Sequence, residues 1–163
     1  MNIFYLDHDP ARCASYHCDE HVGKMIVEHL QMMSVAMAHH GLSPAIKKDG
    51  TSYSTKAYKN HPCTLWVKES FPNFVWLWKM SRYLSEEFYA RYGKRHAGQK
   101  SLLSLDLESA VKTYPDIGLT PPAQCMANEY KNTHAVVAYR TFYLKDKSRF
   151  ARWDYSPAPY WWV

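Results

Sequence analysis

Four ionisable side chains near the start of the chain recur at helical spacing: His17, His21, Lys24 and Glu28. At about 100° per residue, all four fall within about 60° of one another on an α-helix. A carboxylate and an amine on one face can share the roles of acid, base and nucleophile. This face is therefore predicted to be an active-site wall. The alternative is a solvated surface on which Lys24 and Glu28 form an ordinary ion pair.

Metal binding is a second chemistry that this segment allows. The run HCDEH at residues 17–21 fits the H-x-x-E-H motif, and two histidines four residues apart on a helix can bind zinc together. A third ligand would come from Glu28, His61 or the pair at residues 86–87. The chain is far smaller than the proteases that use this motif, so a protease of that class is not expected. The leading prediction has no metal, with zinc or another divalent metal at these two histidines as the alternative.

One long amphipathic helix is expected to position these side chains. Asp9 followed by Pro10 is typical of an N-cap and first helical residue, and Gly41 is typical of a helix end. We therefore predict a helix from about Pro10 to His40. Gly23 inside it marks either the close approach of another backbone or a weak point. The opposite face is predicted to join the core through Val22, Ile26, Leu30, Met33 and Met37.

The rest of the chain is also predicted to be helices and loops. Residues 2–6 form a short strand or an extended arm, and residues 41–60 form a long loop. Further helices are expected from residue 62, from Ser70 and Pro72 to about Tyr92 with a stop at Gly93, over 101–113, and over about 127–146. A proline-rich loop covers 114–125. The fold class is mostly α, a single compact helical domain over 1–163 with a short N-terminal extended segment and an aromatic, extended C-terminal tail over 147–163.

Composition limits the class of protein. The 163 residues carry a formal charge of +5 and are 15% aromatic, which suits a nucleic-acid partner because cations meet phosphates and rings stack on bases. A charged fraction of 21% argues against disorder. No apolar run is long enough to span a membrane, and the N-terminus does not have the pattern of a signal peptide. We therefore expect a cytoplasmic protein whose composition fits a nucleic-acid partner.

The four cysteines are expected to be free thiols in a chain without an export signal. They form no C-x-x-C pair, so neither a zinc knuckle nor a dithiol redox site is indicated. No glycine-rich phosphate loop and no G-x-S-x-G motif is present.

Three segments combine basic, aromatic and amide side chains and are predicted to contact nucleic acid. The segment before Pro62 is a phosphate-contacting loop or, alternatively, a surface turn capped by Asn60. Rings in the C-terminal tail suit stacking on unpaired bases, although packing on the core is favoured for most of them because exposed aromatic clusters invite aggregation. The predicted contacts are Lys56, Tyr58, Lys59, Asn60, His61, Arg91, Lys94, Arg95, Arg149, Arg152 and Trp153.

The whole chain resembles a family of small, mostly uncharacterised proteins common in phage genomes. The resemblance rests on the motifs HCDxH at 17–21, KM at 24–25 with Glu28, YxNHP at 58–62, TPP at 120–122 and ARW at 151–153. It implies little about activity.

A remoter resemblance is more informative. The stretch TKAYKNHP at residues 55–62 is similar to one in pyrimidine-dimer DNA glycosylases of the endonuclease V type, which are small, basic, mostly helical proteins with an aromatic, basic tail. The similarity covers roughly residues 1–95 and the character of the tail. It implies that Glu28 is the catalytic acid and that an N-terminal α-amine attacks the sugar C1′. The chain differs in beginning Met-Asn, where the best-known enzyme exposes Thr, and in having His where that helix usually has Arg.

We therefore predict a base-excision DNA glycosylase with possible strand cleavage. Glu28 would stabilise or protonate the opening sugar, and the amine of Met1, or Lys24 instead, would attack C1′. His17 and His21 would move protons or hold a phosphate. The alternatives are a metal-dependent nucleotide or DNA hydrolase that uses these two histidines, and a non-catalytic nucleic-acid-binding module.

Overall fold

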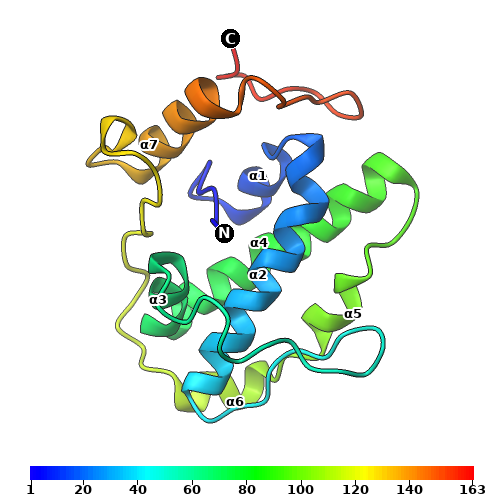
Figure 1. Cartoon of the computed structure of the whole chain (residues 1–163), viewed down its shortest axis with the longest axis vertical. Helices are drawn as coiled ribbons and strands as arrows, with labels where there is room; N and C mark the ends of the chain where they lie inside the picture. Colours follow the sequence, from blue (N-terminus) through cyan, green and yellow to red (C-terminus); the bar gives the residue numbers. More distant parts are fainter.

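A computed structural model describes the whole chain, residues 1–163, as an assembly of helices without a β-strand (Figure 1). The mostly-α prediction is confirmed. The helices are α1 (Pro10–Ser15), α2 (Asp19–His39), α3 (Pro62–Glu69), α4 (Phe71–Tyr92), α5 (Gly98–Leu103), α6 (Leu107–Thr113), the 3₁₀ turn η1 (Asn128–Tyr130), α7 (Ala135–Phe142) and the π-helical turn η2 (Tyr143–Lys147).

Helix α2 runs through the centre of the molecule and packs against α3, α4 and α5 (Figure 1). All five apolar residues predicted to face the core are fully buried. At Gly23 an added Cβ would stand 3.0 Å from the ring of Phe88 on α4. The glycine therefore marks a close approach, by a side chain of α4 rather than by its backbone.

Helix α4 begins and ends where the sequence predicted. The hydroxyl of Ser70 accepts a hydrogen bond from the Asn73 backbone at 3.3 Å, and Gly93 ends the helix in the left-handed conformation with φ +67°. Only glycine adopts that conformation readily, which is why the stop is sharp. Neither long helix has the uninterrupted apolar stretch that crossing a membrane requires.

The predicted helix over residues 10–40 is two helices, which corrects the sequence interpretation. The Asp9 cap is confirmed, because its carboxylate accepts from the Ala11 and Arg12 backbones at 2.8 and 2.9 Å. The helix ends at Ser15, however, and a new one begins at Asp19. The guanidinium of Arg91 donates hydrogen bonds to the carbonyl oxygen of Ser15 at 3.1 Å and to that of His17 at 2.9 Å. These two carbonyls would otherwise accept bonds inside a continuous helix.

Two other predicted helices are interrupted for local reasons. The helix over 101–113 divides into α5 and α6, because the carboxylate of Asp106 accepts from the Ser109 backbone at 2.9 Å and starts a new helix. The helix over 127–146 is broken at 131–134, where the side chain of Gln124 bonds both backbone groups of Asn132. These side-chain bonds satisfy backbone groups that a continuous helix would have used.

The chain ends pack together at one side of the molecule. Residues 2–6 form an extended arm rather than a strand, and all five are buried. Helix α7 and the tail lie across this arm (Figure 1), and Arg140 on α7 donates to the Leu6 carbonyl at 2.9 Å. The extended tail is confirmed, and most of its rings pack against the core while Tyr155 and Tyr160 stay exposed.

Candidate active site

A cavity of about 410 Å³ lies where the N-terminus, α2 and the end of α7 meet. Four of the five residues predicted to be catalytic line it, from the first 28 residues of the chain. A second wall comes from residues 142–150. The full lining is Met1, Asn2, Phe4, Glu20, His21, Lys24, Met25, Glu28, Phe142, Lys147, Arg149 and Phe150.

The carboxylate of Glu28 faces the first two backbone nitrogens of the chain. Its Oε2 atom lies 3.6 Å from the α-amine of Met1 and accepts a hydrogen bond from the Asn2 N–H at 3.2 Å. The Glu28 side chain is 21% exposed, and that of Met1 is 5% exposed. An amine and a carboxylate that can exchange a proton with it therefore lie side by side next to a buried side chain.

Asn2 holds the N-terminus in this position. Its buried side chain accepts from the Ile3 and Phe4 backbones at 2.8 and 3.2 Å and donates to the Cys125 carbonyl at 2.8 Å. Sequence reasoning did not select Asn2. The only signal was the general tendency of asparagine to bond nearby backbone groups.

Lys24 lies at the mouth of the cavity. Its side chain is 61% exposed, and its Nζ atom is 4.0 Å from Glu28 Oε1. An exposed pair at this spacing contributes only a few tenths of a kcal/mol. The geometry suits a partner of Glu28 better than a second nucleophile, because the amine is exposed to water.

His21 lines the cavity but is buried among aromatic rings. Its Nδ1 atom lies 2.5 Å from the Tyr143 hydroxyl, and its ring stacks on Phe4 with centroids 4.5 Å apart. Burial lowers the pKa of His21 to about 3, with a further contribution from His17. The imidazole is therefore neutral near pH 7, so it cannot hold a phosphate by charge.

His17 lies outside the cavity, in contrast to the prediction. It sits in the link between α1 and α2, fully buried, and its Nδ1 atom bonds the Cys13 carbonyl at 2.8 Å. The shared helical face assumed an unbroken helix, and the break at residues 16–18 turns this side chain inward. Its ring centroid is 6.5 Å from that of His21.

These two histidines do not belong to a compact group of three metal ligands. The structure contains one group of three His, Cys, Asp or Glu side chains whose ligand atoms all lie within 4.8 Å of one another, and it is formed by His61, Cys63 and Cys125. The zinc alternative at residues 17–21 therefore lacks a third such ligand.

The buried histidines predict acid sensitivity. Burial lowers the pKa of His17 to about 4 and that of His21 to about 3, and it lowers the pKa of His29 well below the usual value. The unfolded chain therefore binds more protons than the folded chain between about pH 6.5 and pH 4. We expect the free energy of unfolding to fall by about 2 kcal/mol per buried histidine from pH 7 to pH 5.

Urea denaturation at the two pH values checks this. In the variant His17→Gln, the fall in the free energy of unfolding from pH 7 to pH 5 should be smaller by roughly 2 kcal/mol, the contribution of one buried histidine. The exposed His134→Gln is the matched control and should leave the dependence unchanged. An equal pH dependence in both variants would contradict the assignment.

The second wall of the cavity is aromatic and basic. The Nζ atom of Lys147 lies 4.6 Å from the ring centre of Phe142, and the Phe150 ring packs edge-on to His21 at 5.4 Å. Of this wall, only Arg149 was among the predicted nucleic-acid contacts. The others lie more than 110 residues from Glu28 in sequence, so no local spacing could have connected them with it.

The predicted phosphate-contacting loop is exposed. Lys56, Tyr58, Lys59 and Asn60 are all open to solvent. Tyr58 adopts φ +57° with its ring 62% exposed, which is uncommon for a residue with a large side chain. His61, rather than Asn60, caps α3, because its Nδ1 atom accepts from the Cys63 backbone at 3.2 Å.

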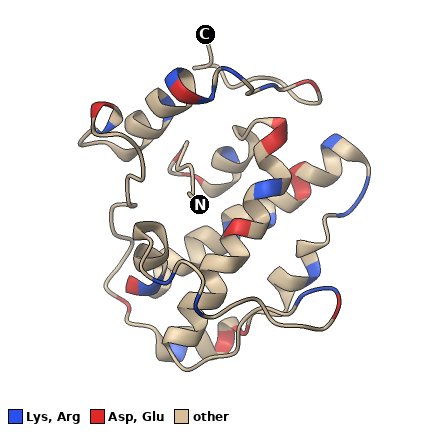
Figure 2. Ribbon diagram, in the orientation of Figure 1, with Lys and Arg blue, Asp and Glu red and all other residues tan.

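Arg91 is not available to DNA, which corrects its predicted role. Its side chain is 1% exposed, and it bonds the carboxylates of Asp19 and Glu87, each at 3.0 Å. The neighbouring Lys94 and Arg95 are exposed, as are the tail residues Arg149 and Arg152. Figure 2 shows the Lys and Arg residues spread over several elements rather than gathered on one.

Trp153 packs against the core rather than standing exposed to solvent. Its ring lies 4.7 Å from that of Trp162, and its indole nitrogen is buried. This matches the expectation that most tail rings cover the core.

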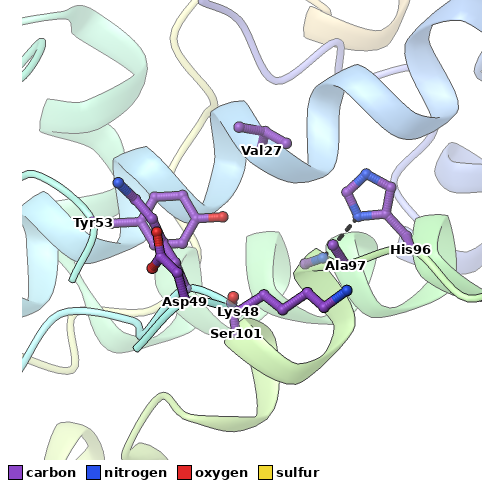
Figure 3. A pocket seen from close by; sticks show the side chains of 9 residues that line it. Val27, Lys48, Asp49, Tyr53, His96, Ala97 and Ser101 are labelled. Atoms are coloured by element: carbon purple, nitrogen blue, oxygen red, sulfur yellow. Dashed lines mark hydrogen bonds between the residues drawn. The ribbon is translucent and has the colours of Figure 1, made fainter. Parts of the chain in front are cut away.

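A second cavity, of about 450 Å³, lies between the α2–α3 loop and α5 (Figure 3). Lys48 and Asp49 from the loop and His96 from beyond α4 line it, with Val27 of α2 at one side. None of the residues predicted to be catalytic lines this cavity. The residues predicted to be catalytic therefore lie, apart from His17, at the cavity beside the N-terminus.

The comparisons with known proteins agree with the geometry. A family model described as pyrimidine dimer DNA glycosylase matches residues 1–99. Comparisons with curated proteins and with solved structures give no significant match. The matched span includes the N-terminal amine, Glu28 and the first wall of the cavity, and it ends before the second wall begins.

Proposed function

Because the chain belongs to the pyrimidine dimer DNA glycosylase family, we propose that it cleaves the N-glycosidic bond of a pyrimidine dimer in DNA with its N-terminal amine as nucleophile. One observation carries this proposal. The α-amine of Met1 lies 3.6 Å from the Glu28 carboxylate, inside a cavity with aromatic and cationic walls.

In the proposed reaction the lone pair of the amine attacks C1′ of the deoxyribose. The bond between C1′ and the base nitrogen breaks, and its electron pair moves onto the base, which stays joined to the other pyrimidine of the dimer. The attacking nitrogen gives its protons to Glu28 and to solvent, the bond from C1′ to the ring oxygen opens, and that oxygen takes up a proton. An imine then joins the enzyme to C1′.

Strand cleavage follows from the same intermediate. Loss of a proton from C2′ expels the 3′ phosphate, and water then hydrolyses the imine and frees the amine. We assign the attack to Met1 rather than Lys24 because α-amines lose their proton closer to neutral pH than lysine side chains do, and because the Met1 nitrogen is sheltered beside the carboxylate.

The walls of the cavity suit a nucleotide turned out of the duplex. Phe142 and Phe150 offer rings on which a base can stack, and Lys147 and Arg149 offer cations for phosphates. Neutral His21, backed by Tyr143, offers a hydrogen bond rather than charge. Lys56 and Lys59 on the exposed loop, with Lys94 and Arg95 beyond α4, would contact the DNA backbone at a distance from the cavity.

Borohydride trapping tests the proposal. Reduction of the imine on DNA that contains a pyrimidine dimer should capture a covalent complex, and mass spectrometry should locate the DNA on the N-terminal peptide. Capture on a peptide that contains Lys24 would overturn the choice of nucleophile. Failure to capture any complex, with cleavage of the glycosidic bond intact, would remove the amine mechanism.

An extension of the N-terminus gives a sharper prediction. One added residue moves the free amine by about 3.8 Å, away from Glu28. Trapping and cleavage of the glycosidic bond should therefore fall by at least about 100-fold, because nucleophile and carboxylate no longer meet. Proteolytic removal of the extension to restore the Met1 amine is the matched control and should recover full activity. Equal activity before and after removal would contradict the assignment.

The intact mass of the active protein shows whether Met1 is retained, and so which residue carries the reacting α-amine. Glu28 contacts the backbone nitrogen of Asn2 as well as the amine of Met1. If the active protein proves to lack Met1, the amine of Asn2 stands at the same carboxylate, and the trapped peptide should then begin with Asn2.

A further inference from the structure

The two sulfur atoms of Cys63 and Cys125 lie 3.3 Å apart without a disulfide between them. Cys63 is the second residue of α3 and is fully buried, whereas Cys125 belongs to the loop before η1 and is partly exposed. They are 62 residues apart in the chain. The fold therefore brings two thiols from separate segments into direct contact.

His61 completes a group of three. Its ring stands just before α3, and one ligand atom from each of these three side chains lies within 4.8 Å of the other two. From these contacts we propose that His61, Cys63 and Cys125 bind a zinc-class metal ion, with solvent as the fourth ligand.

The geometry requires little movement. Zinc–sulfur bonds of about 2.3 Å in a tetrahedron place two thiolates about 3.8 Å apart, so the sulfur atoms need to separate by only about 0.5 Å from 3.3 Å. Two thiolates and an imidazole are the ligands that zinc prefers in proteins. The Cys63 backbone loses its bond to the His61 ring if Nδ1 is the nitrogen that binds the metal, which is the loss of one hydrogen bond at a partly buried cap.

The charge of the site fits its surroundings. Two thiolates neutralise a divalent ion, so the filled site adds no net charge beside the α-amine of Met1. That amine is close enough to contribute to the lowered pKa of His61, after the larger effect of burial. The filled site therefore places no additional positive charge next to the ion pair of the Met1 amine with Glu28.

The position of the site indicates what the metal would do. The carbonyl of Cys125 accepts the side-chain bond of Asn2 at 2.8 Å, and Thr64 contacts the sulfur of Met1 at 3.9 Å. A metal bridging α3 to the 114–127 loop would fix both segments against the first two residues. The ion is a clamp on the N-terminus and takes no part in the reaction.

Metal binding to the full-length, reduced and chelator-treated protein tests this. Dialysis against Zn²⁺ should load one ion per chain, and Co²⁺ should give the strong visible absorption of a tetrahedral thiolate site. Cys125→Ser and His61→Asn should each weaken binding by at least about 100-fold, since changes merely in the groups around metal ligands cost 10–100-fold. Asparagine keeps a cap for α3, so that variant separates the ligand from the cap.

The matched control is Cys18→Ser, which changes a buried thiol at the start of α2 and should bind metal like the wild type. His21→Asn should also bind normally. Absence of a tightly bound ion in the reduced wild type overturns the proposal, and so does normal binding by both Cys125→Ser and His61→Asn. A disulfide formed on mild oxidation, in a chain that takes up no metal when reduced, overturns it too. Because metal absorption rather than glycosidic-bond cleavage is measured, failure here leaves the glycosylase proposal standing.

Discussion

Glu28→Gln is expected to lower the rate of glycosidic-bond cleavage by about 10³-fold, because general acid–base catalysis by a positioned side chain contributes 10²–10⁴-fold. Glutamine keeps an oxygen that can accept the Asn2 backbone bond, so the position of the N-terminus should hold. What is lost is the negative charge beside the α-amine of Met1. The variant therefore separates the chemistry of the carboxylate from its structural contacts.

Single-turnover kinetics on DNA with one pyrimidine dimer measures the loss, and filter binding or anisotropy measures affinity. Affinity should be unchanged or higher, since a negative charge near the phosphates is removed. Glu20→Gln makes the same change of charge in the same cavity without contacting the N-terminal nitrogens, and it should alter the rate by less than about threefold. Equal losses in the two variants would mean that cavity charge, rather than Glu28, determines the rate.

Local signals in the sequence determine much of the fold. The ends of α4 follow from the Ser70 cap and the Gly93 stop, and the core face of α2 follows from its apolar spacing. These features depend on residues within a few positions of one another. Sequence reasoning can therefore recover them without knowing the tertiary structure.

The break in the first helix could not be predicted in this way. The break depends on Arg91, which lies 74 residues from His17 in the chain and donates a hydrogen bond to the His17 carbonyl oxygen. Nothing in the local sequence around Ser15 marks a helix end, because neither glycine nor proline follows. The mistaken single helix then placed His17 on the same face as Glu28.

The candidate site divides in the same way. The catalytic roles of Glu28 and of the Met1 amine were predicted from the resemblance to the glycosylase family. The structure brings the two groups together. The second wall, with Phe142 and Lys147, and the contact of Cys63 with Cys125 join segments far apart in sequence. A single amino-acid sequence gives no signal for such pairs.

Arg91 gives the largest expected effect on stability. Its guanidinium bonds the carboxylates of Asp19 and Glu87 and the carbonyl oxygens of Ser15 and His17. These bonds tie the end of α1, the start of α2 and the last turn of α4 into one joint. Removing one partner of a buried ion pair costs about 3–5 kcal/mol, because the remaining charges stay buried without compensation.

We therefore expect Arg91→Met to lower the free energy of unfolding by about 3–5 kcal/mol in urea denaturation. Methionine retains an unbranched apolar chain in the same space, so the loss reflects the bonds rather than the packing. Arg91→Lys should also destabilise, because one ammonium cannot reproduce the planar set of donors that reaches four groups. Lys94→Ala, two residues past the end of α4 and exposed, should stay within about 0.5 kcal/mol of wild type.

The same variants distinguish a structural arginine from a DNA contact. If Lys94 meets a phosphate, Lys94→Ala should reduce the salt dependence of DNA binding by about one ion. Arg91→Lys, folded at the assay temperature, should retain the wild-type salt dependence, because the buried side chain touches no phosphate. Wild-type stability of Arg91→Met together with a reduced salt dependence in Arg91→Lys would restore Arg91 to the DNA interface. A destabilised Arg91→Met together with a wild-type salt dependence in Arg91→Lys would instead identify Arg91 as the residue that separates α1 from α2 and turns His17 away from the cavity.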